Sequence, residues 1–227
     1  GFRQDDIAVG LWHSPDRSRA AALVDAGILE RNFYLWLQED IGLGEDLRLV
    51  LGLRGDYFTF NVNDHLEGSP ASLPHASGLT QQAILNPKAS LVYSPTQTLD
   101  LFANFGTGFH SNDARNNVIN RRVADLASAW RQDGLDDEAI DIDLAALNFD
   151  PGHRGVTTLP RAIGIEVGAR THLARRLNLG AALWLLDIEE EFVFVGDAGT
   201  TEASGRTRRA GLDLEGRLQV AAWPWAD

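Results

Sequence analysis

The sequence predicts an all-β chain: an antiparallel, up-and-down segment of a transmembrane β-barrel with about eight strands. Three observations predict it. Apolar and polar residues alternate over segments as long as Asp46–Phe60. The connections between segments are alternately long and short, which places long loops at one end of the sheet and short turns at the other. Most aromatic residues lie near segment ends, as the interfacial girdles of such barrels do.

Three segments near the N-terminus carry the alternation. Arg3–Leu11 and Leu29–Asp40 each place three apolar residues on one face, and Asp46–Phe60 has leucine at every odd position from Leu47 to Leu53. This two-residue period is typical of a strand with one polar face. Ordinary strands have ~5–6 residues, whereas a tilted strand needs ~9–11 residues to cross the hydrocarbon. The lengths therefore favour membrane strands.

Five later segments continue the same period. In the segment Arg161–Leu173, for example, Ile163, Ile165 and Val167 alternate with glycine and charged residues. The five predicted strands are Lys88–Ser94, Leu99–Phe109, Arg161–Leu173, Leu177–Val195 and Arg208–Ala222.

The predicted connections fall into two length classes. The long ones are Trp12–Ile28, Asn61–Asn86, His110–Leu159 and Asp197–Arg206, and the short ones are Ile41–Glu45, Ser94–Gln97 and Ala174–Arg176. His110–Leu159 shows no alternation, and a short helix is expected near Glu138–Leu147. A connection of this length is usually functional or disordered.

The composition excludes several classes of protein. The 227 residues include no cysteine, which rules out disulfides and thiolate zinc sites, and the net charge of −12 opposes nucleic-acid binding. No run approaches the ~18 apolar residues of a membrane helix; barrel strands leave almost no hydropathy signal. The absence of methionine, even at Gly1, indicates a processed chain or a fragment.

Catalytic and metal-binding patterns are weak, so we expect no enzyme, no cofactor and no metal site. His110, Ser111 and Asp113 have the residue types of a hydrolytic triad, but neighbours in sequence do not form its geometry and no nucleophile elbow is present. The acidic run from Asp133 to Asp143 lacks the spacing of an EF-hand, which favours a solvated loop. Gly196–Gly199 precedes no helix pattern and so forms no phosphate loop.

Two sets of polar residues are candidates for recognition. The first is a lip where strands meet the long connections; it either contacts a ligand or simply anchors the loop through Asn112 and Asp113 hydrogen bonds. Its members are Phe109, His110, Asn112, Asp113, Arg115 and Asp197. The second set is expected to face the lumen: Arg48, Arg54, Asp56, Asp100, Glu166, Arg170, Asp213, Glu215 and Arg217.

Several sequence segments resemble segments in the barrels of TonB-dependent outer-membrane receptors. They are Leu47–Asp56, Asn86–Leu91 followed by Tyr93-Ser94-Pro95, Leu101–Phe109, Gly108–Arg115 and Phe194–Glu202. The resemblance covers nearly the whole chain and is weakest in Ser14–Gly27 and Val118–Pro151. Order and spacing together make it specific.

The resemblance implies energised uptake at the bacterial outer membrane. A barrel of about 22 strands holds a plug domain, and it binds a scarce small-molecule ligand such as a siderophore, cobalamin, haem or an oligosaccharide. The implied partners are outer-membrane lipid, the plug and the TonB complex, with no nucleic acid. This sequence lacks a plug, a TonB box and a terminal aromatic strand, so residues 1–227 are expected to be a partial barrel domain.

Two alternatives remain open at this stage. One is a complete eight-stranded outer-membrane barrel that acts as a binding module or an enzyme. The other is a soluble β-sandwich that binds sugars.

Overall fold

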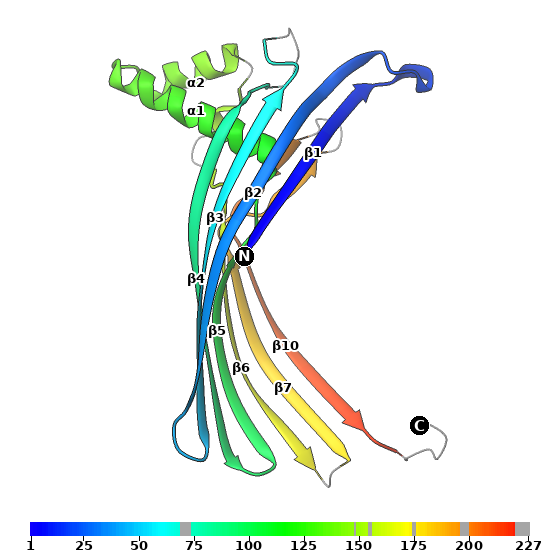
Figure 1. Cartoon of the computed structure of the whole chain (residues 1–227), viewed down its shortest axis with the longest axis vertical. Coiled ribbons are helices and arrows are strands. Elements are labelled where there is room, and N and C mark those ends of the chain that lie inside the picture. The colour runs from blue at the N-terminus through cyan, green and yellow to red at the C-terminus, as the bar shows by residue number, and fades with distance from the viewer. Residues whose placement is uncertain (69–73, 148, 154–155, 174–175, 196–199, 221–227) are drawn as a thin grey trace.

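A computed structural model describes residues 1–68, 74–147, 149–153, 156–173, 176–195 and 200–220. They form one curved, open antiparallel sheet of eight strands in the order β1-β2-β3-β4-β5-β6-β7-β10. Short turns join the strands at one end, and two helices and the longer connections lie at the other (Figure 1). No helix among the described residues is long and apolar enough to span a membrane.

The elements follow the predicted up-and-down order. The sheet contains β1 (Phe2–His13), β2 (Ala21–Gly42), β3 (Leu47–Asp64), β4 (Gly78–Thr96), β5 (Leu99–Phe109), β6 (Arg161–Leu173), β7 (Leu177–Ile188) and β10 (Thr207–Leu218). The helices are α1 (Ala114–Gln132) and α2 (Asp137–Ala146), and a separate hairpin pairs β8 (Phe192–Val195) with β9 (Thr200–Ala203).

The register divides the sheet into two faces. Side chains of paired residues point to the same side of an antiparallel sheet. Successive pairings therefore give an apolar face, which carries Leu37, Leu53, Leu91, Leu183 and Leu212. All five of these leucines are exposed. The polar face carries the alternate residues of each strand.

The apolar face has the height of a membrane. On β3 it runs from Leu47 to Tyr57, ten residues apart (57 − 47). At ~3.3 Å per residue and the ~35–45° tilt of barrel strands, this distance corresponds to ~25 Å along the barrel axis, the height of an outer-membrane apolar band. Aromatic residues mark its upper edge, where the rings of Phe2 and Phe33 lie 4.7 Å apart. Beyond it, Tyr57 donates a hydrogen bond to Gln81.

Three strands continue beyond this band into segments that were predicted to be loops. β2 begins at Ala21, within the expected connection Trp12–Ile28. β3 ends at Asp64 and β4 begins at Gly78, both within the expected connection Asn61–Asn86. Those boundaries were wrong because apolar side chains occupy the polar face here, which removes the alternation. Ile28 and Val62 are paired in the ladder, and both are buried.

The segment His110–Leu159 was predicted as a long loop with one short helix, and it contains two. The predicted helix near Glu138–Leu147 is confirmed as α2. α1 was missed because its first turns are rich in asparagine, a residue with low helix propensity. Here tertiary packing stabilises the helix, since residues 114–120 are all buried.

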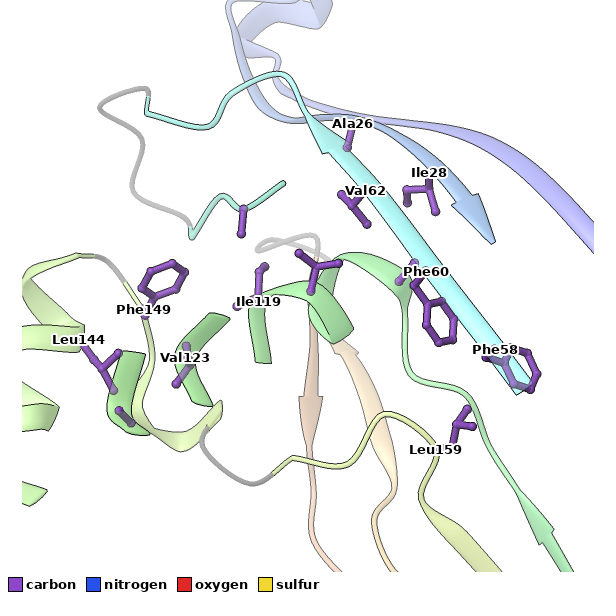
Figure 2. Packing of buried hydrophobic residues seen from close by; sticks show 14 of the residues in the cluster. Ala26, Ile28, Phe58, Phe60, Val62, Ile119, Val123, Leu144, Phe149 and Leu159 are labelled. Carbon is purple, nitrogen blue, oxygen red and sulfur yellow. The ribbon is translucent and has the colours of Figure 1, made fainter. Parts of the chain in front are cut away.

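A buried cluster holds α1 against the polar face of β2, β3 and β4. Figure 2 shows Phe58, Phe60 and Val62 of β3 together with Ile119 and Val123 of α1. Phe60 and Val123 have no exposed surface. Because apolar burial contributes ~25 cal/mol per Å², this cluster is what orders the long connection.

The predicted strand Leu177–Val195 is two elements. β7 ends at Ile188, and Phe192–Val195 pairs with Thr200–Ala203 inside the expected loop Asp197–Arg206. Asp197 itself lies outside the described residues, as does the last part of the predicted strand Arg208–Ala222.

We expect Phe60→Ala to release α1 from the sheet. Truncating a buried phenylalanine costs ~3–5 kcal/mol, so amide hydrogen exchange within residues 114–132 of the full-length protein should lose ~100-fold or more in protection. The control is Leu53→Ala on the apolar face, which should leave α1 unchanged. Equal effects of both variants would show that the cluster does not hold the helix.

Candidate functional site

The polar face has a hollow below the α1 cluster. Its volume is about 430 Å³, within the ~300–1,000 Å³ typical of small-molecule sites. Two rows of paired residues form it: Trp36, Arg54 and Asn86 in one, and Gln38, Gly52 and Lys88 in the next. Thr107 of β5 closes one side. Each side chain is therefore positioned by the ladder, and not by a loop.

Arg54 is fixed by a buried carboxylate. Its Nε and Nη2 atoms donate to the two oxygens of Asp56, at 2.8 and 2.7 Å, and Asn32 donates to the same carboxylate at 3.1 Å. The guanidinium also lies 4.3 Å from the centre of the Tyr34 ring. A bidentate pair of this kind holds the arginine in one orientation. Its charge is largely balanced by Asp56.

Lys88 carries the charge that is not balanced. Its Nζ donates to the neutral Gln38 amide at 2.7 Å, and no carboxylate among the described residues forms an ion pair with it. The side chain lies across Gly52, where an added Cβ would be 2.3 Å from the lysine Cε. Glycine leaves the space that the lysine occupies, and any side chain at position 52 would displace the lysine. Lys88 is also the only lysine in the sequence.

Trp36 supplies a flat apolar surface next to these cations. Its side chain is in the same hollow and is 64% exposed. An exposed indole can stack on a planar ligand, while Lys88 provides positive charge for an anion. Asn86 is 7% exposed; its Oδ1 accepts from Thr107, and its Nδ2 has no partner among the described residues. The hollow therefore offers a ring surface, a cation and an amide donor.

This arrangement suits recognition and not catalysis. The hollow holds no histidine, cysteine or unpaired carboxylate that could act as a general base or nucleophile. In the described part of the chain, no group of three or more histidine and acidic side chains could hold a metal ion.

The nine residues expected to face the lumen all lie on the polar face in the observed register. They are Arg48, Arg54, Asp56, Asp100, Glu166, Arg170, Asp213, Glu215 and Arg217. Some pair with one another or with neighbours: Arg170 lies 3.9 Å from Asp100, and Glu166 accepts from Asn104 at 3.2 Å. Their contact with a lumen stays a prediction.

The expected lip residues lie mainly at the buried start of α1. The Phe109 ring packs edge-on against Phe58, 5.5 Å between centroids. Asp113 is the N-cap and accepts from the Arg115 backbone N–H at 2.9 Å, while Asn112 accepts from the backbone N–H of Asp113 at 2.8 Å. These contacts match the anchoring alternative. A ligand contact by this set stays a prediction.

Two carboxyl groups near the buried start of α1 have raised pKa values. Burial raises the pKa of Asp113, and the Arg115 N–H offsets part of the effect. Burial also raises the pKa of Glu30 on β2, and the charges of Asp5 and Asp113 raise it further, whereas Arg3 lowers it. Desolvation and like charge both favour the neutral acid.

Most of the hollow was not singled out from sequence. Arg54 was placed among the lumen-facing charges. Trp36 and Gln38 fall on the polar side of their own predicted strand, and this alternation was the available signal that they share a face with Arg54. Lys88 gives no pattern beyond being the sole lysine, since its place beside Gln38 depends on pairing across two strands.

Comparisons with known proteins agree with this architecture. Residues 2–226 match the family described as TonB dependent receptor-like, beta-barrel. Comparison with curated protein sequences finds no match.

Several solved structures share the fold. The ferric-catecholate import receptor Fiu from E. coli K12 has 20% identity and a TM-score of 0.57, over 91% of this chain and 29% of that chain. The siderophore receptor PiuA from Acinetobacter baumannii has 17% and 0.54, over 89% and 25%. The alcaligin receptor FauA from Bordetella pertussis has 16% and 0.52, over 97% and 32%. The chain thus spans a quarter to a third of these relatives.

We expect the contact between α1 and the sheet to weaken as pH rises. Both pKa values are raised in the folded state, so this contribution to stability is complete below the ordinary carboxyl pKa and is lost as pH increases through the raised values. Hydrogen exchange of residues 114–118, corrected for intrinsic rates, should show more protection at acidic pH. Glu30→Gln should flatten the profile, whereas the exposed Asp125→Asn should not. Greater protection at neutral pH in the unmodified protein would contradict this expectation.

We expect Gly52→Ala to displace Lys88. Losing one hydrogen bond of ~0.5–1.5 kcal/mol should raise the rate of amine labelling at Lys88 about two- to tenfold. Peptide mapping of the full-length protein measures this rate. The matched control is Gly106→Ala on the other side of Lys88, where the new Cβ would be 3.9 Å from the lysine Cβ. Identical rates of Lys88 labelling in both variants would contradict the packing of the lysine side chain over Gly52.

Proposed function

Because the chain belongs to the family of TonB-dependent receptor β-barrels, we propose that it forms one section of the wall of a receptor that imports an anionic ferric chelate of the siderophore class. The proposed route crosses the bacterial outer membrane, where the barrels of this family lie. Its polar face would line the lumen and its apolar face would contact lipid.

The observation that supports this ligand class is the unbalanced Lys88 beside the exposed Trp36. Arg48, Arg54 and Arg170 of the polar wall each have a carboxylate partner. A cation held only by the Gln38 amide keeps its attraction for an incoming anion. Ferric catechol chelates are anionic and present planar catechol rings, so the indole and the ammonium would complement the same molecule.

The relatives support the same class. Fiu is a ferric-catecholate import receptor, PiuA is a siderophore receptor and FauA is an alcaligin receptor. At 16–20% identity these relatives share only the fold with this chain. The proposed ligand class is therefore supported mainly by the side chains of the hollow. An oligosaccharide could also stack on Trp36, but it would gain little from Lys88.

Energised uptake would require partners outside this chain. We expect a plug domain to contact the charged polar face and the TonB complex to act on that plug. Paired charges such as Arg170 and Asp100 near the short turns offer hydrogen-bonding groups for such a domain. The net charge of −12 gives no basis for a nucleic-acid partner.

We expect Lys88→Gln to weaken binding of an anionic chelate selectively. The full-length receptor would be titrated with a ferric tris-catecholate and with a neutral ferric trihydroxamate. Loss of one charge-assisted bond should raise Kd for the catecholate about tenfold, or ~1.4 kcal/mol, and leave the hydroxamate unchanged. Lys88→Arg should retain affinity, and Arg121→Gln on the exposed face of α1 is the remote control.

Uptake completes the test. Cells that carry the full-length receptor should accumulate the labelled catecholate only when the TonB complex is present. An unchanged catecholate Kd in Lys88→Gln, or an equal loss of affinity for both chelates, would overturn the anionic ligand class, and uptake independent of TonB would overturn the energised mechanism.

A further inference from the structure

We propose that the apolar face carries a specific site for one phosphorylated lipid of the outer leaflet, with an acyl chain over Gly55 and the phosphate at Arg161. The site is on the opposite side of the wall from Lys88. Its apolar lining is on the other face of the sheet, and the two sites meet where Arg161 donates a hydrogen bond to Thr107.

The site is a shallow hollow in an otherwise continuous apolar face. Its volume is about 830 Å³, which is at the upper end of the ~300–1,000 Å³ range of small-molecule sites. The side chains that line it from the apolar face are Phe33, Leu35, Tyr57, Ala83 and Leu85. An apolar tail that enters this hollow would contact three adjacent strands.

Gly55 is the reason the hollow exists. It pairs with Leu35 on one side and Leu85 on the other, both with large side chains on the apolar face. A Cβ at Gly55 would lie 3.2 Å from the Leu85 Cδ2 atom. The missing side chain thus leaves a depression bordered closely by Leu85, which a side chain at position 55 would have to displace.

Arg161 places a cation at the rim. It is the first residue of β6, and its Nη1 donates to the Leu85 carbonyl at 2.8 Å and to the Thr107 hydroxyl at 3.4 Å. Glu189 accepts from the backbone N–H of Arg161 and not from its guanidinium. Among the described residues the guanidinium has no carboxylate partner, unlike Arg206 and Arg208, which share Asp187. A phosphate would be a well-matched bidentate partner.

A break in the sheet brings Arg161 to this position. Pairing between β4 and β5 extends upward only to Lys88 and Gly106, whereas β3 and β4 remain paired up to Gly78. The edge of β4 at Leu85 therefore has no β5 partner, and the arginine satisfies its carbonyl. The same bond holds the guanidinium beside the hollow.

The height of the site matches the headgroup region of a membrane. Phe33 and Tyr57 stand at the upper edge of the apolar band, and Tyr57 bonds the polar Gln81 above it. Aromatic residues concentrate at this level in outer-membrane barrels. Since the hollow is continuous with the lipid-facing band and meets a cation beside Leu85, an amphipathic anion fits it better than another protein surface does.

The test measures lipid retained by the full-length receptor in non-ionic detergent. A diphosphorylated lipid A is titrated in, and native mass spectrometry counts the bound molecules. We expect saturation at one lipid per receptor. Gly55→Leu, which fills the hollow, and Arg161→Gln, which removes the charge, should each raise the apparent Kd about tenfold. Dephosphorylated lipid should bind the unmodified receptor with an apparent Kd that is likewise about tenfold higher.

Two matched controls define the outcome. Gly216→Leu adds the same side chain elsewhere on the apolar face, where an added Cβ would make an ordinary contact with Leu179 at 3.6 Å. Arg121→Gln removes a remote arginine. Both should retain lipid, and heat-modifiable migration checks that every variant is folded. Equal retention by all four variants, or loss in Gly55→Leu with none in Arg161→Gln, would overturn the proposal. So would a receptor dimer that disappears in Gly55→Leu, because another copy would then occupy the hollow.

Discussion

Backbone hydrogen bonding is the constraint on which the rest of this structure depends. Inside hydrocarbon no water can satisfy an N–H or C=O group, so strands must pair with strands. The ladder through β1 to β7 and β10 meets this requirement between neighbouring strands, except at the outer edges of the described sheet and beside the upper part of β4. Once every strand is paired, the pleat directs alternate side chains to opposite faces. The apolar and polar faces, and the positions of both candidate sites, follow from that alternation.

Above the apolar band this constraint relaxes, and the chain uses the freedom to build a second core. Water can reach the backbone there, so the polar face no longer has to be polar. Phe58, Phe60 and Val62 turn that face of β3 apolar and bury α1 against it. The hollow at Lys88 lies below this junction, between a helix held by apolar contact and a wall of paired charges. A ligand there would contact the strands of the sheet, below the helix whose anchoring depends on Asp113 and Glu30.

Two glycines on β3 give the wall its depressions. Gly52 on the polar face gives room for the Lys88 side chain, and Gly55 on the apolar face leaves space between two leucines. Being three residues apart, they point to opposite sides of the sheet. One strand can therefore contact a transported ligand and a membrane lipid at nearly the same level. The break in pairing beside Gly106 adds Thr107 to one site and Arg161 to the other.

The sequence by itself determined the strands and their faces, because a two-residue period records directly which side chains meet lipid. Arg54, Asp56 and Glu166 were placed on the polar side of the sheet by that rule alone, and a short helix was expected at the position of α2. Only the tertiary structure decided which residues meet across strands. The hollow requires Trp36, Arg54 and Lys88 to be adjacent in register, and α1 requires Phe60 beneath it. Local patterns carry no information about register or about packing between distant segments, since both arise from contacts formed after the chain folds.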